Sequence, residues 1–189
     1  MQIGEQELIE SSIRGDTDSR RAIYSRHVQY LSAVCSRYIT DPSDVKDVLQ
    51  EAFIKIFQSL GRFEWRGEGS LRSWMTRIVV NESLKLLRNN RKLDIFVATP
   101  ELPDVPDDDG DDGEISVENV PPEAVHSMIR ELPDGYRTVF NLFVIEGRSH
   151  REIAEMLGIS EATSASQFHR AKRILAKRIR EYVASGEGV

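Results

Sequence analysis

The sequence has 189 residues, a formal net charge of −6 and a single cysteine, Cys35. One cysteine excludes an internal disulfide and a thiolate zinc site, and its expected role is that of a small buried apolar residue. No apolar run approaches the roughly 20 residues that a membrane-spanning helix needs, and the first residues lack a signal-peptide pattern. We therefore expect a cytoplasmic protein without membrane insertion.

The negative charge is concentrated in one segment. Residues 1–90 carry 13 Lys and Arg against 12 Asp and Glu, and residues 122–189 carry 10 against 9, whereas residues 91–121 carry 2 against 10. Apolar periodicity also ends in this acidic segment, which is rich in Pro and Gly and has little to bury. The sequence thus predicts two small domains, residues 1–92 and 122–189, joined by a flexible acidic linker over residues 93–121.

Four helices are predicted in the first domain, over residues 5–13, 17–39, 43–60 and 70–90, because apolar residues recur there at intervals of three and four. At the end of the first of these, Ile13 is expected to face the core. The buried side of the fourth is expected to comprise Leu71, Trp74, Ile78, Leu84 and Leu87.

The third predicted helix has the most regular apolar stripe in the chain, from Val45 to Leu60. Its opposite face is acidic and amide-rich. Such a face is either simply solvated or suited to docking on a basic partner helix, and both interpretations stay open. The residues on this face are Asp44, Asp47, Gln50, Glu51 and Lys55.

The loop Gly61–Gly69 combines Phe63 and Trp65 with two arginines and three glycines. Aromatic rings beside guanidinium groups in a mobile loop can stack on unpaired bases. The alternative is that the rings close the core beneath the loop. We keep that alternative open for Phe63 and favour contact with nucleic acid for Trp65.

Ser70 is expected to cap the fourth helix, which has a polar, basic flank. Basic side chains suit a phosphate backbone, and Asn81 can offer paired amide hydrogen bonds to a base. The flank comprises Arg72, Arg77, Asn81, Lys85, Arg88, Asn89, Arg91 and Lys92.

A helix-turn-helix pattern follows in the second domain, after helices expected around residues 122–131 and 135–146. Ser149 and Glu152 form a capping box that starts one helix, and Gly158 ends it in a left-handed conformation. After a short turn, a second helix begins.

Ser160 caps this second helix, in which Ser164, Phe168, Ala171 and Leu175 would face inward. The polar and basic side chains rotated away from them can reach base edges and phosphates in a major groove. A solvated amphipathic helix is the alternative, but the order of the caps favours DNA binding. The outward residues are Thr163, Ser166, Gln167, His169, Arg170 and Arg173.

No catalytic, cofactor or metal site is predicted. The acids of residues 93–121 do not have the spacing of an EF-hand loop, because Gly110 would fall on a ligand position when counted from Asp108. The four histidines are scattered, and no carboxylate pair or glycine-rich phosphate loop has catalytic spacing. We therefore do not expect an enzyme.

Three ordered blocks closely resemble the extracytoplasmic-function (ECF) sigma factors of bacteria, which belong to the sigma-70 family. The resemblance implies an all-α protein of two helical domains, one that binds core RNA polymerase and opens the −10 element and one that reads the −35 element. Implied partners are core RNA polymerase, promoter DNA and an anti-sigma factor. The blocks are DPSDVKDVLQEAFIKIFQSLGRF, FEWRGEGSLRSWMTRIVVNESLKLLRNNRK and LPDGYRTVFNLFVIEGRSHREIAEMLGISEATSASQFHRAKRIL.

By position, the resemblance also implies roles for residues of this chain. The block that docks on the polymerase β′ clamp helices is matched by Asp44, Asp47, Gln50, Glu51 and Phe53. The loop that captures a flipped-out −10 base is matched by the segment that contains Trp65, Arg66 and Ser70, and the strand-opening helix by Arg72, Arg77, Asn81 and Arg88. The −35 helix is matched by Ser166, Gln167, His169, Arg170 and Arg173.

The sequence departs from the family pattern in the −35 helix. The family usually has Gly-Thr-Val and then Lys or Arg where this chain has Ala162 to Ala165, and a basic residue is common at Gln167. Ser164 places a hydroxyl where the family packs an apolar side chain, and Ala165 lacks the basic group that is common there. The competing hypothesis is an autonomous helix-turn-helix regulator that binds an operator without polymerase. The loop around Trp65 separates the two, because such a regulator has no use for a single-strand pocket.

Overall fold

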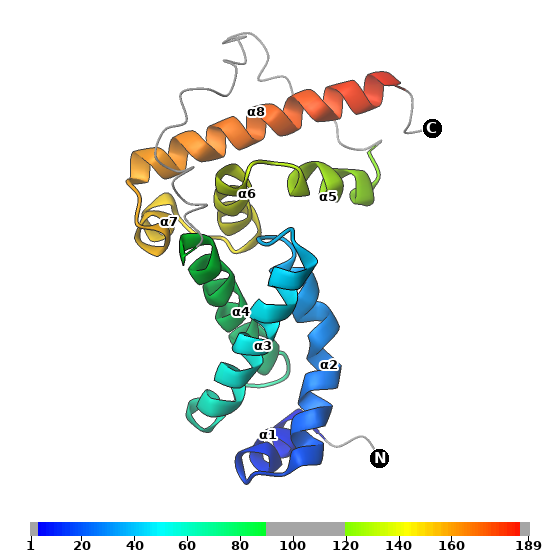
Figure 1. Cartoon of the computed structure of the whole chain (residues 1–189), viewed down its shortest axis with the longest axis vertical. Helices are drawn as coiled ribbons and strands as arrows, with labels where there is room; N and C mark the ends of the chain where they lie inside the picture. Colours follow the sequence, from blue (N-terminus) through cyan, green and yellow to red (C-terminus); the bar gives the residue numbers. More distant parts are fainter. Residues whose placement is uncertain (1–3, 90–119, 186–189) are drawn as a thin grey trace. The chain divides into compact units, whose positions relative to one another are not determined.

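A computed structural model describes residues 4–89 and 120–185 of the chain. Every regular element in these ranges is helical, and the chain divides into two compact units within residues 1–89 and 90–189 (Figure 1). The predicted all-α fold of two helical domains is therefore confirmed. The predicted linker, residues 93–121, lies almost wholly outside the described residues. None of the described helices is long and apolar enough to cross a membrane.

Four α-helices and one 3₁₀ turn make the N-terminal unit. The helices α2, α3 and α4 pack against one another, and the short α1 lies against α2. Their shared core includes the fully buried side chains of Leu31, Tyr38 and Ile56. The elements are α1 (Glu5–Ile13), α2 (Thr17–Cys35), α3 (Pro42–Ser59), η1 (Leu60–Arg62) and α4 (Ser70–Asn89).

Side-chain caps determine where α2 and α3 begin. The Asp16 carboxylate accepts a hydrogen bond from the amide of Ser19 at 2.8 Å, and Asp41 accepts from the amides of Ser43 and Asp44 at 2.8 and 3.2 Å. These carboxylates satisfy amide donors that the first turn of a helix leaves unpaired. Hydrogen bonds from Ser19 also hold the pKa of Asp16 below its ordinary value.

The structure corrects two predictions about the first two helices. Ile13 was predicted to be inward, but it is the last residue of α1 and its side chain is exposed. The second helix ends at Cys35 rather than at residue 39. The residues that follow form a turn, and the turn still delivers Tyr38 to the core.

Leu71, Leu84 and Leu87 of α4 are buried as predicted, but in the first half of the helix the buried stripe is rotated from the predicted one. It follows a spacing of four residues through Leu71, Met75 and Val79, all of which are buried. Trp74 and Ile78, which were predicted to be core residues, flank this stripe and are only half-buried. The rotation leaves both side chains partly available at the surface between α4 and its neighbours.

The C-terminal unit is built on the long helix α8. The helices α5, α6 and α7 all contact α8, and a cluster of Leu132, Tyr136, Ala171 and Leu175 lies in its core. One π-helical segment, η3, continues α6, so the predicted helix over residues 135–146 is two elements. The elements are α5 (Pro122–Arg130), α6 (Asp134–Phe140), η3 (Asn141–Ile145), α7 (His150–Leu157) and α8 (Glu161–Ser185).

A buried arginine holds the turn between α5 and α6. The side chain of Arg137 is 3% exposed, and its Nη1 donates to the carbonyl oxygens of Arg130 and Leu132 at 3.1 and 2.8 Å. Its Nη2 donates to the carboxylate of Asp134 at 2.6 Å. The guanidinium group thus satisfies backbone acceptors that would otherwise be left without partners in the interior.

The predicted helix-turn-helix is confirmed in α7 and α8. The Ser149 hydroxyl accepts from the amide of Glu152 at 3.3 Å, and the Glu152 carboxylate accepts from the amide of Ser149 at 2.9 Å. The bond from the Ser149 amide, with those from Arg148 and the Ser149 hydroxyl, lowers the pKa of Glu152. Gly158 ends α7 at a φ of 71°, a conformation that glycine adopts without steric cost.

Candidate nucleic-acid interface

The loop between η1 and α4 keeps one aromatic ring on the surface and turns the other inward. Trp65 is 40% exposed, and its Nε1 donates to the Glu5 carboxylate on α1 at 3.3 Å. Phe63 is half-buried, with its ring 5.1 Å from that of Trp74. Phe63 therefore packs on Trp74 at the base of the loop, and because it is only half-buried, part of its side chain stays accessible.

Two glycines and a serine shape the end of this loop. Gly67 and Gly69 have φ values of 112° and 82°, which side chains other than glycine rarely adopt. The Ser70 hydroxyl donates to the carbonyl oxygen of Gly67 at 2.6 Å and accepts from the amide of Arg66 at 3.2 Å. Ser70, predicted to contact DNA, is thus occupied in holding the loop against the start of α4.

The loop and α4 enclose an open pocket of about 470 Å³, which we call the loop pocket. Its aromatic wall comes from Phe63 and Trp74, whereas Trp65 does not line it. Guanidinium groups surround the rings, and one of them, from Arg66, pairs with Glu64 at 3.0 Å. The lining residues are Arg62, Phe63, Glu64, Arg66, Ser70, Ser73, Trp74 and Arg77.

The predicted basic flank of α4 lies on its exposed side. Arg72, Arg77, Asn81 and Arg88 are all exposed. The guanidinium carbon of Arg72 lies 4.0 Å from the ring centroid of Tyr30 on α2, a cation–π contact that fixes its direction. Arg77 lines the loop pocket. Of these four residues, Arg77 therefore lies at the loop pocket, and the other three lie elsewhere along the helix.

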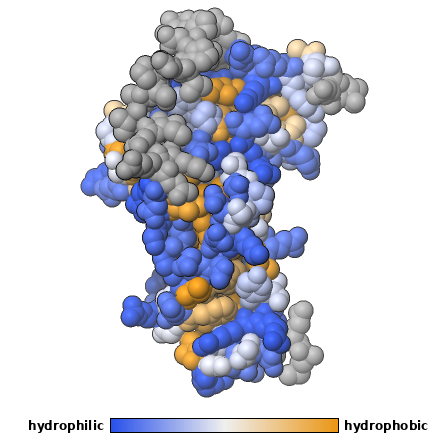
Figure 2. Space-filling view, viewed as in Figure 1, coloured by the Kyte–Doolittle hydropathy of each residue, from blue (hydrophilic) through white to orange (hydrophobic). Residues whose placement is uncertain are grey.

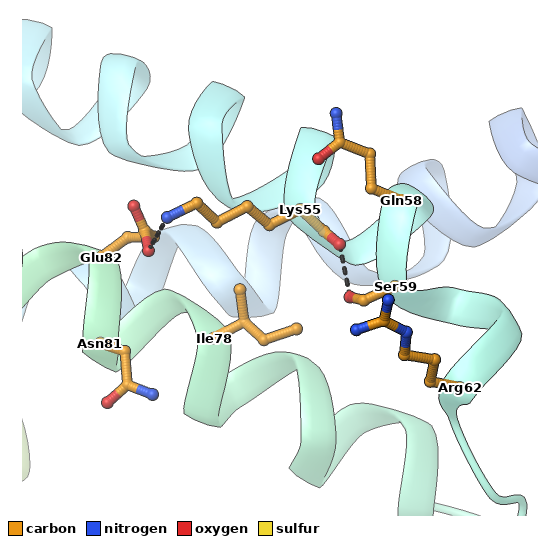
Figure 3. A pocket seen from close by; sticks show the side chains of 7 residues that line it. All are labelled: Lys55, Gln58, Ser59, Arg62, Ile78, Asn81 and Glu82. Carbon is orange, nitrogen blue, oxygen red and sulfur yellow. Dashed lines mark hydrogen bonds and ion pairs between the residues drawn. The ribbon is translucent and has the colours of Figure 1, made fainter.

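A second open pocket, of about 440 Å³, lies between α3 and α4 (Figure 3). We call it the interhelix pocket. Lys55 of α3 and Glu82 of α4 form an ion pair across it, and the Ser59 hydroxyl donates to the carbonyl oxygen of Lys55. Its lining residues are Lys55, Gln58, Ser59, Arg62, Ile78, Asn81 and Glu82.

The outer face of α3 is largely as predicted. Asp47, Gln50 and Glu51 are exposed, and Asp44 is half-buried in the first turn. The exception is Phe53, which is buried inside the domain.

Phe53 is only 5% exposed, with its ring 4.6 Å from Tyr24 and 6.1 Å from Phe57. The ring therefore supports α3 from beneath and cannot itself meet a partner. The sequence analysis missed Ile54, which is 44% exposed and follows Gln50 and Glu51 at helical spacing. That spacing could have identified it. Figure 2 shows a mostly hydrophilic surface on the face drawn, interrupted by hydrophobic patches.

One predicted base-reading residue of α8 is also buried. Gln167 is 5% exposed, and its Oε1 has no hydrogen-bond partner among the described residues. The buried stripe of α8 passes from Ser164 through Gln167 to Ala171, while Phe168 lies beside it, half-buried against Phe143 at 4.4 Å. The prediction that Gln167 contacts DNA is therefore not supported by its position.

The unusual hydroxyl of Ser164 has a partner. Ser164 is fully buried, and its Oγ lies 3.0 Å from Nδ1 of His150 at the start of α7. The imidazole ring itself stacks on Phe143 with centroids 4.6 Å apart. A hydrogen bond across the two helices thus replaces the apolar packing that the family pattern predicts.

The remaining predicted residues of α8 lie at or near the surface. Ser166, His169 and Arg170 are exposed, while Thr163 and Arg173 are half-buried. The Thr163 amide donates to the Ser160 hydroxyl at 2.9 Å, so Thr163 belongs to the cap of the helix. This exposed surface is small and carries His169 and Arg170 as its long side chains.

Comparisons with known proteins agree with this architecture. A family model described as sigma-70 region 2 matches residues 23–93, and one described as sigma-70, region 4, matches residues 123–175. The chain is 28% identical over 182 residues to an RNA polymerase sigma-H factor of Pseudomonas aeruginosa, covering 93% of each. It is 29% identical over 185 residues to an ECF RNA polymerase sigma-E factor of Haemophilus influenzae, covering 94% of this chain and 96% of the relative. It is 28% identical to the ECF RNA polymerase sigma factor SigW of Bacillus subtilis, covering 89% and 92%.

Proposed function

The chain belongs to the sigma-70 family as a factor of the ECF type, and from this we propose how its two units divide the work. An ECF sigma factor binds core RNA polymerase and directs it to promoters, and it catalyses no reaction of its own. The N-terminal unit binds the polymerase and takes up the unpaired −10 strand. The C-terminal unit reads the −35 duplex. The protein acts in the cytoplasm, where the polymerase works.

The loop pocket is the observation that carries this proposal. Phe63 and Trp74 supply ring faces for an unstacked base, and Arg66 and Arg77 supply charge for its phosphates. Extruding a base costs a few kcal/mol, which stacking and hydrogen bonds in such a pocket can offset. A regulator that reads only duplex DNA has no use for this pocket, so the sigma factor is favoured over the autonomous regulator.

The outer face of α3 is the proposed polymerase contact. Asp47, Gln50 and Glu51 are exposed and polar, and Ile54 adds an exposed apolar side chain beside them. An apolar centre with an acidic rim suits a basic partner helix, such as the β′ clamp helices. An anti-sigma factor would compete for the same face. Asp44 lies at its edge, and Phe53 acts only by supporting the helix.

The exposed side of α8 is the proposed −35 reader. His169 and Arg170 can reach base edges or phosphates in the major groove, and Ser166 lies one turn nearer the start of the helix. Thr163 and Arg173 lie at the margins of this surface. Gln167 is left out of it because its side chain is buried.

Runoff transcription with purified core polymerase tests the proposal. Core plus this chain should initiate on some members of a genomic promoter pool, and core alone should not. Ile54→Glu should abolish core binding in gel filtration, while Arg21→Ala, on the exposed surface of α2, should have no effect. If core plus this chain initiates no better than core alone, the proposal is refuted. A dimer that shifts short operators without polymerase would support the autonomous regulator instead.

A further inference from the structure

A hydrogen bond to α1 holds the middle of the loop between η1 and α4. The Nε1 of Trp65 donates to the carboxylate of Glu5 at 3.3 Å, across 60 positions of the sequence. We propose that Glu5 is a positioning residue for single-strand binding: it holds Trp65 against α1, and Trp65 in turn keeps the loop pocket in its binding shape. This inference rests on the proposed function, since it assumes that the loop pocket takes up an unpaired base.

The helix α1 gives this bond a fixed support. Leu8 and Ile9 of α1 are each 3% exposed, so the helix is anchored in the core of the N-terminal unit. It contacts α2 and also η1, the turn from which the loop starts. Glu5 is the first residue of α1 and is half-buried. A carboxylate in the first turn is favoured by the helix dipole, and it accepts a stronger hydrogen bond than a neutral group does.

The two ends of the loop have contacts of their own. Phe63 packs on α4 at one end, and the Arg66 amide donates to the Ser70 hydroxyl at the other, at 3.2 Å. Trp65 lies between these contacts, and its bond to Glu5 ties it to α1. The loop is therefore held at both ends by α4 and in its middle by α1.

The direction of Trp65 affects the direction of its neighbours. Glu64 and Arg66 both line the loop pocket, and Trp65 between them does not. The segment starts with an extended backbone at Phe63, where φ is −75° and ψ is 128°. Neighbouring side chains of an extended segment point to opposite sides, so holding Trp65 toward α1 keeps Glu64 and Arg66 directed to the pocket. Without that bond the segment would have to be ordered when the strand binds, which lowers affinity.

Electrostatics alone gives the opposite expectation for Glu5. A carboxylate near a surface that binds an anionic strand is repulsive, so removing its charge should strengthen binding. Loss of the hydrogen bond to Trp65 should weaken binding instead. Glu7 is an exposed acid in the same first turn of α1 and provides a matched control for charge. The sign of the effect therefore separates the two roles.

Fluorescence anisotropy on the full chain tests the inference with end-labelled single-stranded dA, dC and dT homopolymers of about ten nucleotides. A hydrogen bond changes an equilibrium constant by about two- to tenfold, and a partly exposed one lies toward the lower end. Glu5→Ala should therefore weaken binding of the tightest homopolymer about threefold. Glu5→Gln keeps an acceptor and should bind at least as tightly as the wild type, as should Glu7→Ala.

A double-mutant cycle shows whether Glu5 acts through Trp65. Trp65→Phe keeps an aromatic ring and removes the N–H, so alone it should weaken binding about as much as Glu5→Ala. In the Glu5→Ala background it should have little further effect, because the bond is already lost. Fully additive effects would overturn the inference, since the two residues would then act separately.

Hydrogen exchange over residues 63–69 tests the state of the loop without nucleic acid. Exchange should be faster in Glu5→Ala than in the wild type and unchanged in Glu5→Gln. Faster exchange in Glu5→Ala together with unchanged strand binding would give Glu5 a structural role only, and would refute its role in binding.

One further variant separates this inference from the proposed function. Arg77 lines the loop pocket from α4, so Arg77→Ala should weaken binding independently of α1. If Arg77→Ala weakens binding and Glu5→Ala does not, the role of Glu5 is refuted and the loop pocket stands. If the wild type binds none of the three homopolymers, both are refuted.

Discussion

Replacing Gln167 by leucine separates a structural role from a DNA-reading role on α8. Its amide is 5% exposed, and its Oε1 lacks a partner among the described residues. A buried unsatisfied acceptor costs about 1–3 kcal/mol. Leucine removes that cost but fits the space imperfectly, so we expect the free energy of unfolding of the C-terminal unit to rise by about 1 kcal/mol. For a domain of this size the melting temperature should rise by about 4–8 °C.

The measurement combines a calorimetric melt with binding to duplex DNA. The duplex is one that the wild-type chain selects from a randomised library. Gln167→Leu should bind this duplex with the same affinity as the wild type. Arg170→Ala is the exposed control, which should weaken binding and reduce the salt slope by about 0.9. A lower melting temperature together with a changed preferred sequence would refute the reasoning, since it would mean that Gln167 turns outward to read a base.

Three further predictions concern other positions. Ala165→Arg, at an exposed site of α8, should strengthen duplex binding and steepen its salt slope by about 0.9; unchanged binding across a salt titration would contradict the placement of that face. Arg137→Met should lower the free energy of unfolding by about 3–5 kcal/mol in urea titrations, because it leaves buried carbonyls and Asp134 unpaired. Burial lowers the pKa of His27 from 6.5, so the folded state binds fewer protons and stability should fall as pH drops below 6.5; His27→Gln should flatten that slope, and an unaltered slope would exclude His27.

Most of the fold could be predicted because its signals are local. The capping box of Ser149 and Glu152, the left-handed Gly158 and the proline after Asp41 each act within one turn, and each ends or begins a helix where expected. The division of α6 from η3 could not be predicted, because a π-helical turn has no marked sequence signal. The number of domains could be predicted because the apolar periodicity stops in the acidic segment between them.

The misplacement of Gln167 has a simple physical origin. Neighbouring residues on a helix point about 100° apart, so a stripe placed one residue off exchanges an inward side chain for an outward one. On α8, Gln167 was predicted to face outward but is buried beside the half-buried Phe168. On α3, periodicity placed Phe53 correctly in the buried stripe, and its assignment to the polymerase contact came only from the resemblance.

Trp65 shows a second limit of the sequence analysis. Its hydrogen bond to Glu5 joins residues 60 positions apart, and the packing of Phe63 on Trp74 joins the loop to the helix that follows it. Periodicity within one helix carries no information about such contacts. The aromatic wall of the loop pocket could therefore not be assigned from the loop sequence.

The buried polar groups of α8 bear on where promoter discrimination arises. Ser164 and Gln167 take up inward positions, and the exposed first turns offer Ala162 and Ala165, which are too short to reach base edges. Few side chains of α8 then remain to read the −35 duplex directly. Phosphate contacts and DNA shape should therefore contribute much of the affinity of α8 for this duplex. Discrimination between promoters should accordingly depend more on the loop pocket of the N-terminal unit, where an unpaired base would present its full edge.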